Sequence, residues 1–182
     1  FVVDPIDGTR AFIEGGKDWS HALAIVESGR VTAAAVYLPV RDLMYAATLG
    51  GGATLNGAPI GASVAQLDGA TVLGAKPNFE GRFWRNGITP PIKREFRSSL
   101  AYRLCLVAQG RFDAMITLRP SWEWDIAAGA LIAAEAGATV TDQHTNALHF
   151  NNPVPQVPGV LAAGPALHSI LAQRLESHSA KP

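Results

Sequence analysis

The stretch from Ile126 to Ala136 is the part of the sequence that most constrains the fold. Its only charged residue is Glu135, and the others are Ile, Leu, Ala and one Gly. A helix that is apolar on every side leaves no face for water and is buried between other elements. The chain must therefore build layers around this helix, and its 182 residues are enough to do so.

The first half of the chain predicts a meander of antiparallel strands. Apolar runs at 21–26, 31–38 and 43–48 are interrupted by turn-forming residues, and the last run is followed by the glycine hairpin Gly50–Gly52. A further strand is expected at 1–3 and a connector at 61–69.

From residue 71 onward, the pattern alternates between strands and helices. Such alternation predicts a mixed sheet covered by helices. Ser98 is the expected N-cap of a helix that ends at Gly110. Residues 71–75 begin this unit, and the expected elements are strands at 112–118, 139–141 and 160–163, and helices at 98–110, at 124–136 and from Pro165 onward.

Composition narrows the class of protein. Fifteen Lys and Arg against fifteen Asp and Glu give no net charge, which removes the electrostatic case for a nucleic-acid polymer or a membrane surface as partner. The single cysteine, Cys105, is expected to be a core thiol. No apolar run approaches the length of a membrane span. These features predict a soluble protein of the cytoplasm.

The hexapeptide Asp4-Pro5-Ile6-Asp7-Gly8-Thr9 is the sharpest chemical feature. Its two carboxylates follow a strand, and Thr9 is expected to cap a short helical turn whose N–H groups suit a phosphate. Carboxylates aimed at one place repel each other unless a cation lies between them, and oxygen ligands favour Mg²⁺ or Mn²⁺. The alternative is an ordinary turn, because Asp-Pro and Asp-Gly are common turn dipeptides.

Asp125 stands at the beginning of the buried helix, where the helix dipole favours an ionised carboxylate. Taken alone, it can equally be a capping aspartate. Glu123 beside it is expected to be a solvated charge in the first turn.

Together, the hexapeptide and the later Trp124-Asp125-Ile126-Ala127-Ala128-Gly129 resemble the two signatures of the inositol monophosphatase family. The resemblance implies an α+β fold, a layered α-β-α-β-α sandwich whose members usually form homodimers. Residues 1–69 would complete a first sheet-and-helix domain, and residues 70–182 would form the second. The family's N-terminal helices and Glu-Glu motif would precede Phe1, and a chain without them is expected to bind metal weakly and turn over little.

The resemblance also implies a role for each matching residue. Asp4 is expected to be shared between two metal ions, with the Ile6 carbonyl serving one ion and Asp7 with Asp125 serving the other. The backbone N–H groups of Gly8 and Thr9 would hold the phosphate, and the Thr9 hydroxyl would orient the attacking water. Asp4 and Thr9 are thus the expected catalytic residues, and the cofactor is two or three Mg²⁺ ions, with Mn²⁺ as a substitute.

The sequence says less about the identity of the substrate than about the metal site. Leu118 stands seven residues before Asp125, where inositol-specific members usually have a glutamate that contacts the inositol hydroxyls. Residues 97–108 instead resemble the bisphosphate-nucleotidase branch, in which a Ser-rich turn and a basic residue lie near a second phosphate. Residues 82–119 contain eight Lys and Arg but only two acids, which suits a doubly phosphorylated substrate or simply forms a solvated face. The expected substrate-binding residues are Arg97, Ser98, Ser99 and Arg103.

The expected function is therefore hydrolysis of a small phosphate ester by a metal-activated water. The ester is expected to be a nucleotide of the 3′-phosphoadenosine 5′-phosphate type or inositol monophosphate, with histidinol phosphate as an alternative. The rival from another class is a catalytically silent homologue that acts as a binding or dimerisation module.

Overall fold

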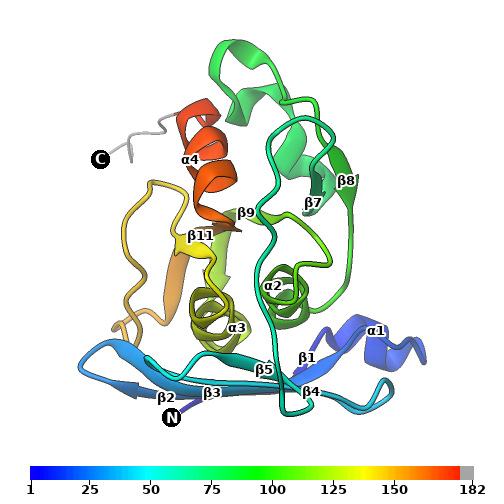
Figure 1. Cartoon of the computed structure of the whole chain (residues 1–182), viewed down its shortest axis with the longest axis vertical. Helices are drawn as coiled ribbons and strands as arrows, with labels where there is room; N and C mark the ends of the chain where they lie inside the picture. The colour runs from blue at the N-terminus through cyan, green and yellow to red at the C-terminus, as the bar shows by residue number, and fades with distance from the viewer. Residues whose placement is uncertain (177–182) are drawn as a thin grey trace.

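The computed structural model describes residues 1–176, which form two β-sheets with helices between and beside them (Figure 1). The first sheet has six strands in the order β1-β2-β3-β4-β5-β6, and every neighbouring pair is antiparallel. The predicted meander is confirmed, including the glycine hairpin between β4 and β5. The bounds are β1 (Val2–Asp7), β2 (Ser20–Glu27), β3 (Arg30–Leu38), β4 (Leu43–Thr48), β5 (Ala53–Leu55) and β6 (Ala58–Pro59), with the short helix α1 (Thr9–Ile13) after β1.

The second sheet has five strands in the order β10-β11-β9-β7-β8. Strand β7 is parallel to both β8 and β9, whereas β11 is antiparallel to β9 and β10, so the sheet is mixed as predicted. The edge strand β8 was not expected, and β9 and β11 are longer than predicted because they continue to pair beyond a bulge at Pro158. The bounds are β7 (Thr71–Leu73), β8 (Lys93–Glu95), β9 (Ala114–Trp122), β10 (Thr139–Thr141) and β11 (Gln156–Ala163), and three short 3-10 turns, η1 (Lys76–Phe79), η2 (Gly81–Phe83) and η3 (Arg85–Gly87), precede β8.

Two helices, α2 (Leu100–Ala108) and α3 (Glu123–Glu135), lie between the sheets, and α4 (Pro165–Arg174) covers the other face of the second sheet (Figure 1). The apolar helix α3 is buried as its sequence requires. A Cβ on Gly129 would lie 2.7 Å from the Cβ of Leu104, so α3 approaches α2 too closely there for any larger residue. Within residues 1–176, none of the helices has the length and hydropathy needed to cross a bilayer.

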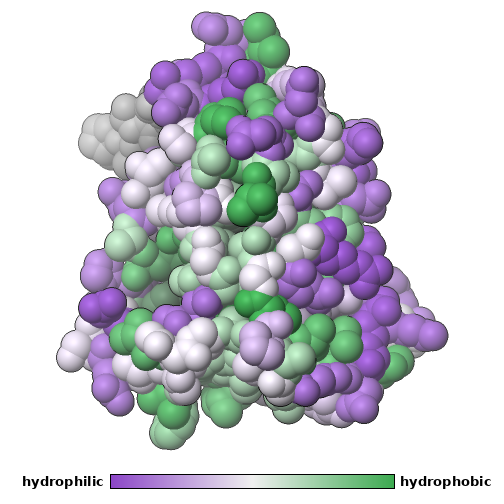
Figure 2. Space-filling model, in the orientation of Figure 1, coloured by the Kyte–Doolittle hydropathy of each residue, from purple (hydrophilic) through white to green (hydrophobic). Residues whose placement is uncertain are grey.

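The face of the first sheet that points away from α2 and α3 is apolar and open to solvent. Val3, Leu23 and Ile25 are 49%, 44% and 36% exposed, and a shallow hollow of about 390 Å³ lies over β2, β3 and β4. Figure 2 shows hydrophobic residues reaching the surface along the lower edge of the molecule, where this sheet lies.

The helix starts differ from the sequence-based expectations. Ser99, not Ser98, is the N-cap of α2, because its Oγ accepts the Tyr102 N–H at 2.9 Å. Gly8 is the N-cap of α1 with a φ of 87°, so Thr9 is the first helical residue rather than the cap. The division into domains at residues 69 and 70 stays a prediction, since one hydrophobic core includes residues of both sheets and of the helices between them.

Candidate metal centre

A β-bulge in β1 brings Asp4 and Asp7 to the same side of the first sheet. Asp4 pairs with Ala22 and Asp7 pairs with Ser20, so β1 has one more residue than β2 between these two pairs. Without the extra residue, side chains three positions apart on a strand would point to opposite faces. The carboxylate of Asp4 also accepts the Ile6 N–H at 2.9 Å, which fixes the bulged segment.

Asp125 reaches the same place from the first turn of α3. One oxygen from each of Asp4, Asp7 and Asp125 lies within 4.8 Å of the other two. The structure therefore brings together the three carboxylates that the sequence analysis singled out, although more than a hundred residues separate the two motifs.

Burial and the neighbouring negative charges make Asp7 and Asp125 hard to ionise. Burial is the main cause that raises the pKa of Asp7 to about 6, and the charge of Asp4 adds to it, whereas hydrogen bonds to Asp7 act in the opposite direction. Burial is also the main cause that raises the pKa of Asp125 to about 7. The charge of Asp7, and the hydrogen bond and charge of Asp4, raise it further. A site with this excess of negative charge gains from a bound cation.

The carboxylate of Asp7 sits on the N-terminus of α2. Its Oδ2 accepts the Ser99 hydroxyl at 2.5 Å and the Ala101 N–H at 2.7 Å, and its Oδ1 accepts the Leu100 N–H at 3.3 Å. These bonds tie β1 to the helix layer and occupy N–H groups that the first turn of a helix leaves unpaired.

The loop after β1 presents the remaining residues of the first motif. The Thr9 side chain is exposed, and its Oγ1 donates to the Ile6 carbonyl at 2.9 Å. A Cβ on Gly8 would lie 3.0 Å from the carbonyl oxygen of Asp18, so the loop turns in a space that only glycine fits.

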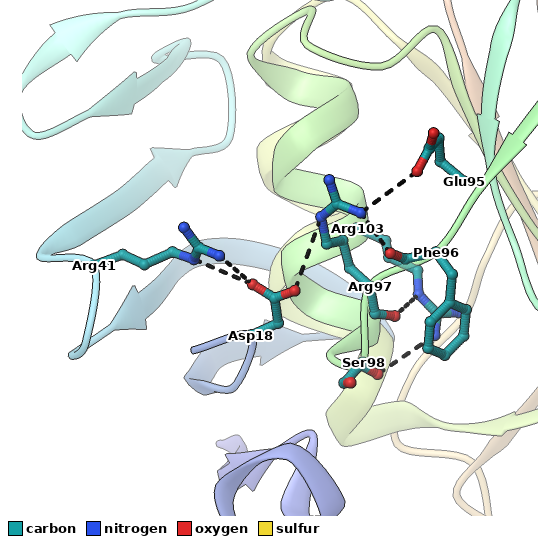
Figure 3. Close-up of polar contacts among 7 residues, drawn as sticks. All are labelled: Asp18, Arg41, Glu95, Phe96, Arg97, Ser98 and Arg103. Carbon is teal, nitrogen blue, oxygen red and sulfur yellow. Dashed lines mark hydrogen bonds and ion pairs between the residues drawn. The ribbon is translucent and has the colours of Figure 1, made fainter. Parts of the chain in front are cut away.

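Arg97, one of the expected substrate ligands, makes its contacts with neighbouring protein groups (Figure 3). Its guanidinium lies 3.8 Å from the carboxylate of Asp18 and 3.7 Å from that of Glu95, and it donates to the Phe96 carbonyl at 2.6 Å. Asp18 also pairs with Arg41 at 2.6 Å.

Arg103 and the two serines lie around the start of α2. Arg103 is buried, and its guanidinium donates to the carbonyls of Arg97 at 2.5 Å and Ser98 at 3.4 Å (Figure 3). Ser99 is fully buried behind Asp7, whereas Ser98 is half-buried and its hydroxyl makes no hydrogen bond within residues 1–176. The substrate-binding roles of these residues stay predictions.

The sequence analysis missed Arg119 as a candidate for this site. Arg119 is exposed near the end of β9, and its charge lowers the pKa of Asp125. Burial is the main cause that lowers the pKa of Arg103 to about 10, and Arg119 adds to that effect, so the two cations lie near each other. The sequence could have indicated Arg119, because it follows directly after the strand predicted at 112–118 and open α/β sheets bind ligands at the carboxyl ends of their strands.

The expectation that Glu123 is solvated is wrong. Glu123 is only 2% exposed, and its carboxylate accepts three hydrogen bonds, from the backbone N–H groups of Asn151 and Asn152 and from the Asn152 side chain, at 2.7 to 3.0 Å. The start of α3 is covered by the loop before β11, which supplies these donors. Cys105, by contrast, is the expected core thiol, and burial raises its pKa well above the ordinary value.

Leu118 stands where inositol-specific members of the family usually have a glutamate, and in this structure it is buried in β9. Its side chain packs in the core between the second sheet and α4.

The two sheets, the helix pair and the converging carboxylates place the chain among the layered α+β phosphatase folds. The model of the inositol monophosphatase family matches residues 1–180. A solved structure of an inositol monophosphatase from Thermotoga maritima superposes with a TM-score of 0.78 at 31% identity, over 94% of this chain and 66% of that one. The chain belongs to the inositol monophosphatase family, and the expected family and fold are confirmed.

Two curated relatives show how much of the family this chain spans. A fructose-1,6-bisphosphatase/inositol-1-monophosphatase of Thermotoga maritima is 36% identical over 146 residues, which is 78% of this chain and 56% of that protein. The Nus factor SuhB of Escherichia coli K12 is 36% identical over 153 residues, again 78% of this chain and 56% of that protein. The chain therefore spans little more than half the length of these relatives.

Proposed function

We propose that this protein is a Mg²⁺-dependent phosphomonoesterase that hydrolyses a small phosphate ester with a metal-activated water. The observation that carries the proposal is the convergence of Asp4, Asp7 and Asp125 within 4.8 Å. Carboxylate oxygens are the ligands that Mg²⁺ and Mn²⁺ prefer. Burial, followed by the neighbouring carboxylate charges, raises the pKa values of Asp7 and Asp125, and this supports a cluster that gains from a bound cation.

In this proposal Asp4 would be shared between two cations, the Ile6 carbonyl would serve one of them, and Asp7 with Asp125 would serve the other. Divalent cations in such a site neutralise phosphate charge and lower the pKa of a bound water. The Thr9 hydroxyl already donates its proton to the Ile6 carbonyl, so its oxygen remains able to accept a hydrogen bond from the attacking water. The backbone N–H groups of Gly8 and Thr9 hold the phosphate.

Two substrates remain in the proposal, and different observations support them. The relative named fructose-1,6-bisphosphatase/inositol-1-monophosphatase favours inositol monophosphate or a sugar phosphate. A nucleotide of the 3′-phosphoadenosine 5′-phosphate type is supported by Arg119 in β9 and by Arg97, which follows β8. Both strands are parallel to β7, so their carboxyl ends lie at the same edge of the sheet. Arg119, Arg97, Arg103 and Ser98 are the residues proposed to face a second phosphate there.

The test is phosphate release by the complete protein that the gene encodes, with Mg²⁺ and with each of inositol 1-phosphate, 3′-phosphoadenosine 5′-phosphate and histidinol phosphate. Asp125→Asn should abolish turnover, because it removes a ligand charge from the cluster. Asp68→Asn is the matched control, since Asp68 is exposed and lies outside the cluster. The preferred ester decides between the substrates, and equal activity of the two variants would contradict the proposed metal site.

A binding role is the second candidate, and the observation that favours it is the 36% identity to a protein named Nus factor SuhB. In this alternative, the chain acts as a cytoplasmic binding or dimerisation module. Absence of phosphate release from every ester, by a folded protein that elutes as a homodimer, would favour it over the enzyme.

A further inference from the structure

The hydroxyl of Ser99 lies directly behind the carboxylate of Asp7, on the side away from solvent. Ser99 is 0% exposed, and its Oγ is 2.5 Å from Asp7 Oδ2, 2.9 Å from the Tyr102 backbone N and 3.0 Å from the Ser20 Oγ. Ser20 is itself fully buried and is the register partner of Asp7 in the first sheet. Three groups from three elements therefore surround one hydroxyl.

The chemistry of these groups determines the direction of each hydrogen bond. An ionised carboxylate can only accept, so the Ser99 hydroxyl donates its proton to Asp7. The Ser99 oxygen then accepts the Tyr102 N–H with one lone pair and the Ser20 hydroxyl with the other. The Ser99 hydroxyl thus has no bonding capacity left for a substrate.

The same bonds divide the two oxygens of Asp7 into different roles. Oδ2 accepts both the Ser99 hydroxyl and the Ala101 N–H at 2.7 Å. Among residues 1–176, the hydrogen bond that Oδ1 accepts is from the Leu100 N–H alone, at the longer distance of 3.3 Å. Oδ1 is therefore the oxygen with a lone pair to offer to a cation.

We propose that Ser99 is a positioning residue, which holds the Asp7 carboxylate so that Oδ1 is presented to the cluster with Asp4 and Asp125. This inference rests on the proposed metal site, and it differs from the expectation that Ser99 binds a substrate phosphate. Partners that orient a metal ligand in this way commonly change metal affinity about 10- to 100-fold when they are removed.

The experiment measures Mn²⁺ binding to the complete protein by calorimetry and by the electron paramagnetic resonance of the bound ion. Ser99→Ala should raise the Kd for Mn²⁺ about tenfold or more. Ser99→Thr should restore binding close to that of the unmodified protein, because it keeps a hydroxyl at the same place. Ser20→Ala is the control, because it leaves the bond between Ser99 and Asp7 intact and should change the Kd far less.

A second measurement separates positioning from substrate contact. At saturating metal, Ser99→Ala should keep the KM for the substrate unchanged, because Ser99 does not touch it. If Ser99→Ala does not fold, both measurements are made on Ser99→Gly instead, because glycine is an acceptable N-cap that also lacks the hydroxyl.

The outcomes distinguish this inference from the proposed function. No Mn²⁺ binding by the unmodified protein would overturn the proposed function and this inference with it. Normal binding by the unmodified protein together with an unchanged Kd in Ser99→Ala or Ser99→Gly would overturn the positioning role alone. A raised KM of Ser99→Ala at saturating metal would show that Ser99 contacts substrate, and this result would also overturn the positioning role.

Discussion

The carboxylate of Glu123 accepts both the backbone N–H and the side-chain amide of Asn152, at 3.0 and 2.7 Å. Glu123 is the first residue of α3, and Asp125 stands two residues later in the same turn. The loop before β11 therefore anchors the turn of helix that presents one of the three clustered carboxylates. This anchoring leads to the first prediction.

Glu123→Gln should lower the free energy of unfolding by about 1–3 kcal/mol, because the Gln amide keeps one acceptor oxygen but turns its NH₂ toward at least one of the three N–H donors and leaves that donor without an acceptor. Urea unfolding measures the loss. Glu14→Gln is the control, since Glu14 is exposed, and it should change stability by less than about 0.5 kcal/mol. A Glu123→Gln protein as stable as the control would contradict the role of these hydrogen bonds.

The acid cluster predicts that the metal-free protein becomes less stable as the pH rises. The pKa values of Asp7 and Asp125 are raised from 3.8 to about 6 and about 7, so the fold favours their protonated forms. Their contribution to stability is full below about pH 4 and is lost as the pH rises through the folded pKa values. Each unit of difference in pKa corresponds to about 1.4 kcal/mol, so the two groups together change the unfolding free energy by at most about 7 kcal/mol, and by less because Asp125 is partly exposed to solvent.

Mg²⁺ should reverse this trend, because protons and the cation compete for the same oxygens. Urea unfolding at about pH 5 and about pH 8, with a chelator and with Mg²⁺, is the measurement. Stabilisation by Mg²⁺ should be much larger at the higher pH, and Asp125→Asn should reduce the dependence on pH. Equal stabilisation at both pH values would speak against a cation bound to these carboxylates.

The positive φ of Gly8 predicts a strong effect of Gly8→Ala. A Cβ there would meet the Asp18 carbonyl at 3.0 Å and the Ser99 backbone N at 3.3 Å, at a φ of 87°. Gly57 has a similar φ of 80° but no atom within 4 Å of an added Cβ. Gly57→Ala should therefore cost only the conformational strain of a positive φ, about 1–2 kcal/mol, whereas Gly8→Ala should cost more and should also lower the proposed phosphatase activity. Thermal unfolding of the two variants side by side checks this.

The close approach of α3 to α2 predicts that Gly129→Ala destabilises the protein although alanine favours helices. The added Cβ would lie 2.7 Å from Leu104 Cβ and 3.1 Å from the Ala101 carbonyl oxygen. Overpacking of this kind costs about 1–3 kcal/mol, against a gain in helix propensity of about 0.5–1 kcal/mol. Ala134→Gly, at an exposed position of the same helix, measures the propensity alone. A Gly129→Ala protein of increased stability would show that the helices can separate without cost.

Local signals account for most of what the sequence predicted. The first sheet is a meander joined by turns of Gly, Asn and Asp, which encode their own geometry within a few residues, and the turns that follow β2, β3 and β4 were expected. The burial of the apolar helix α3 was predictable because a helix without a polar face has no side that it can leave in water. Asp4, Asp7 and Asp125 were candidates because they follow a strand or begin a helix, and they were expected to form one metal site because the two motifs resemble the signatures of the inositol monophosphatase family.

Long-range partners account for what was missed. Glu123 is buried because Asn151 and Asn152, far along the chain, fold over it, and no periodic pattern marks those residues. Ser99 was assigned to substrate because residues 97–108 resemble the bisphosphate-nucleotidase branch, yet the bulge in β1 directs Asp7 onto it. The edge strand β8 is only three residues long, all exposed, and has no alternation to reveal it.

The bulge that turns Asp4 and Asp7 toward Asp125 has a consequence for how the protein folds. The cluster joins the first strand of one sheet to a helix that follows the third strand of the other, so it forms only when contacts of high sequence separation are in place. A cation that binds there binds the native state and not the unfolded chain, and so shifts the folding equilibrium by mass action. Occupancy of the site would therefore report that both sheets and the helices between them have assembled.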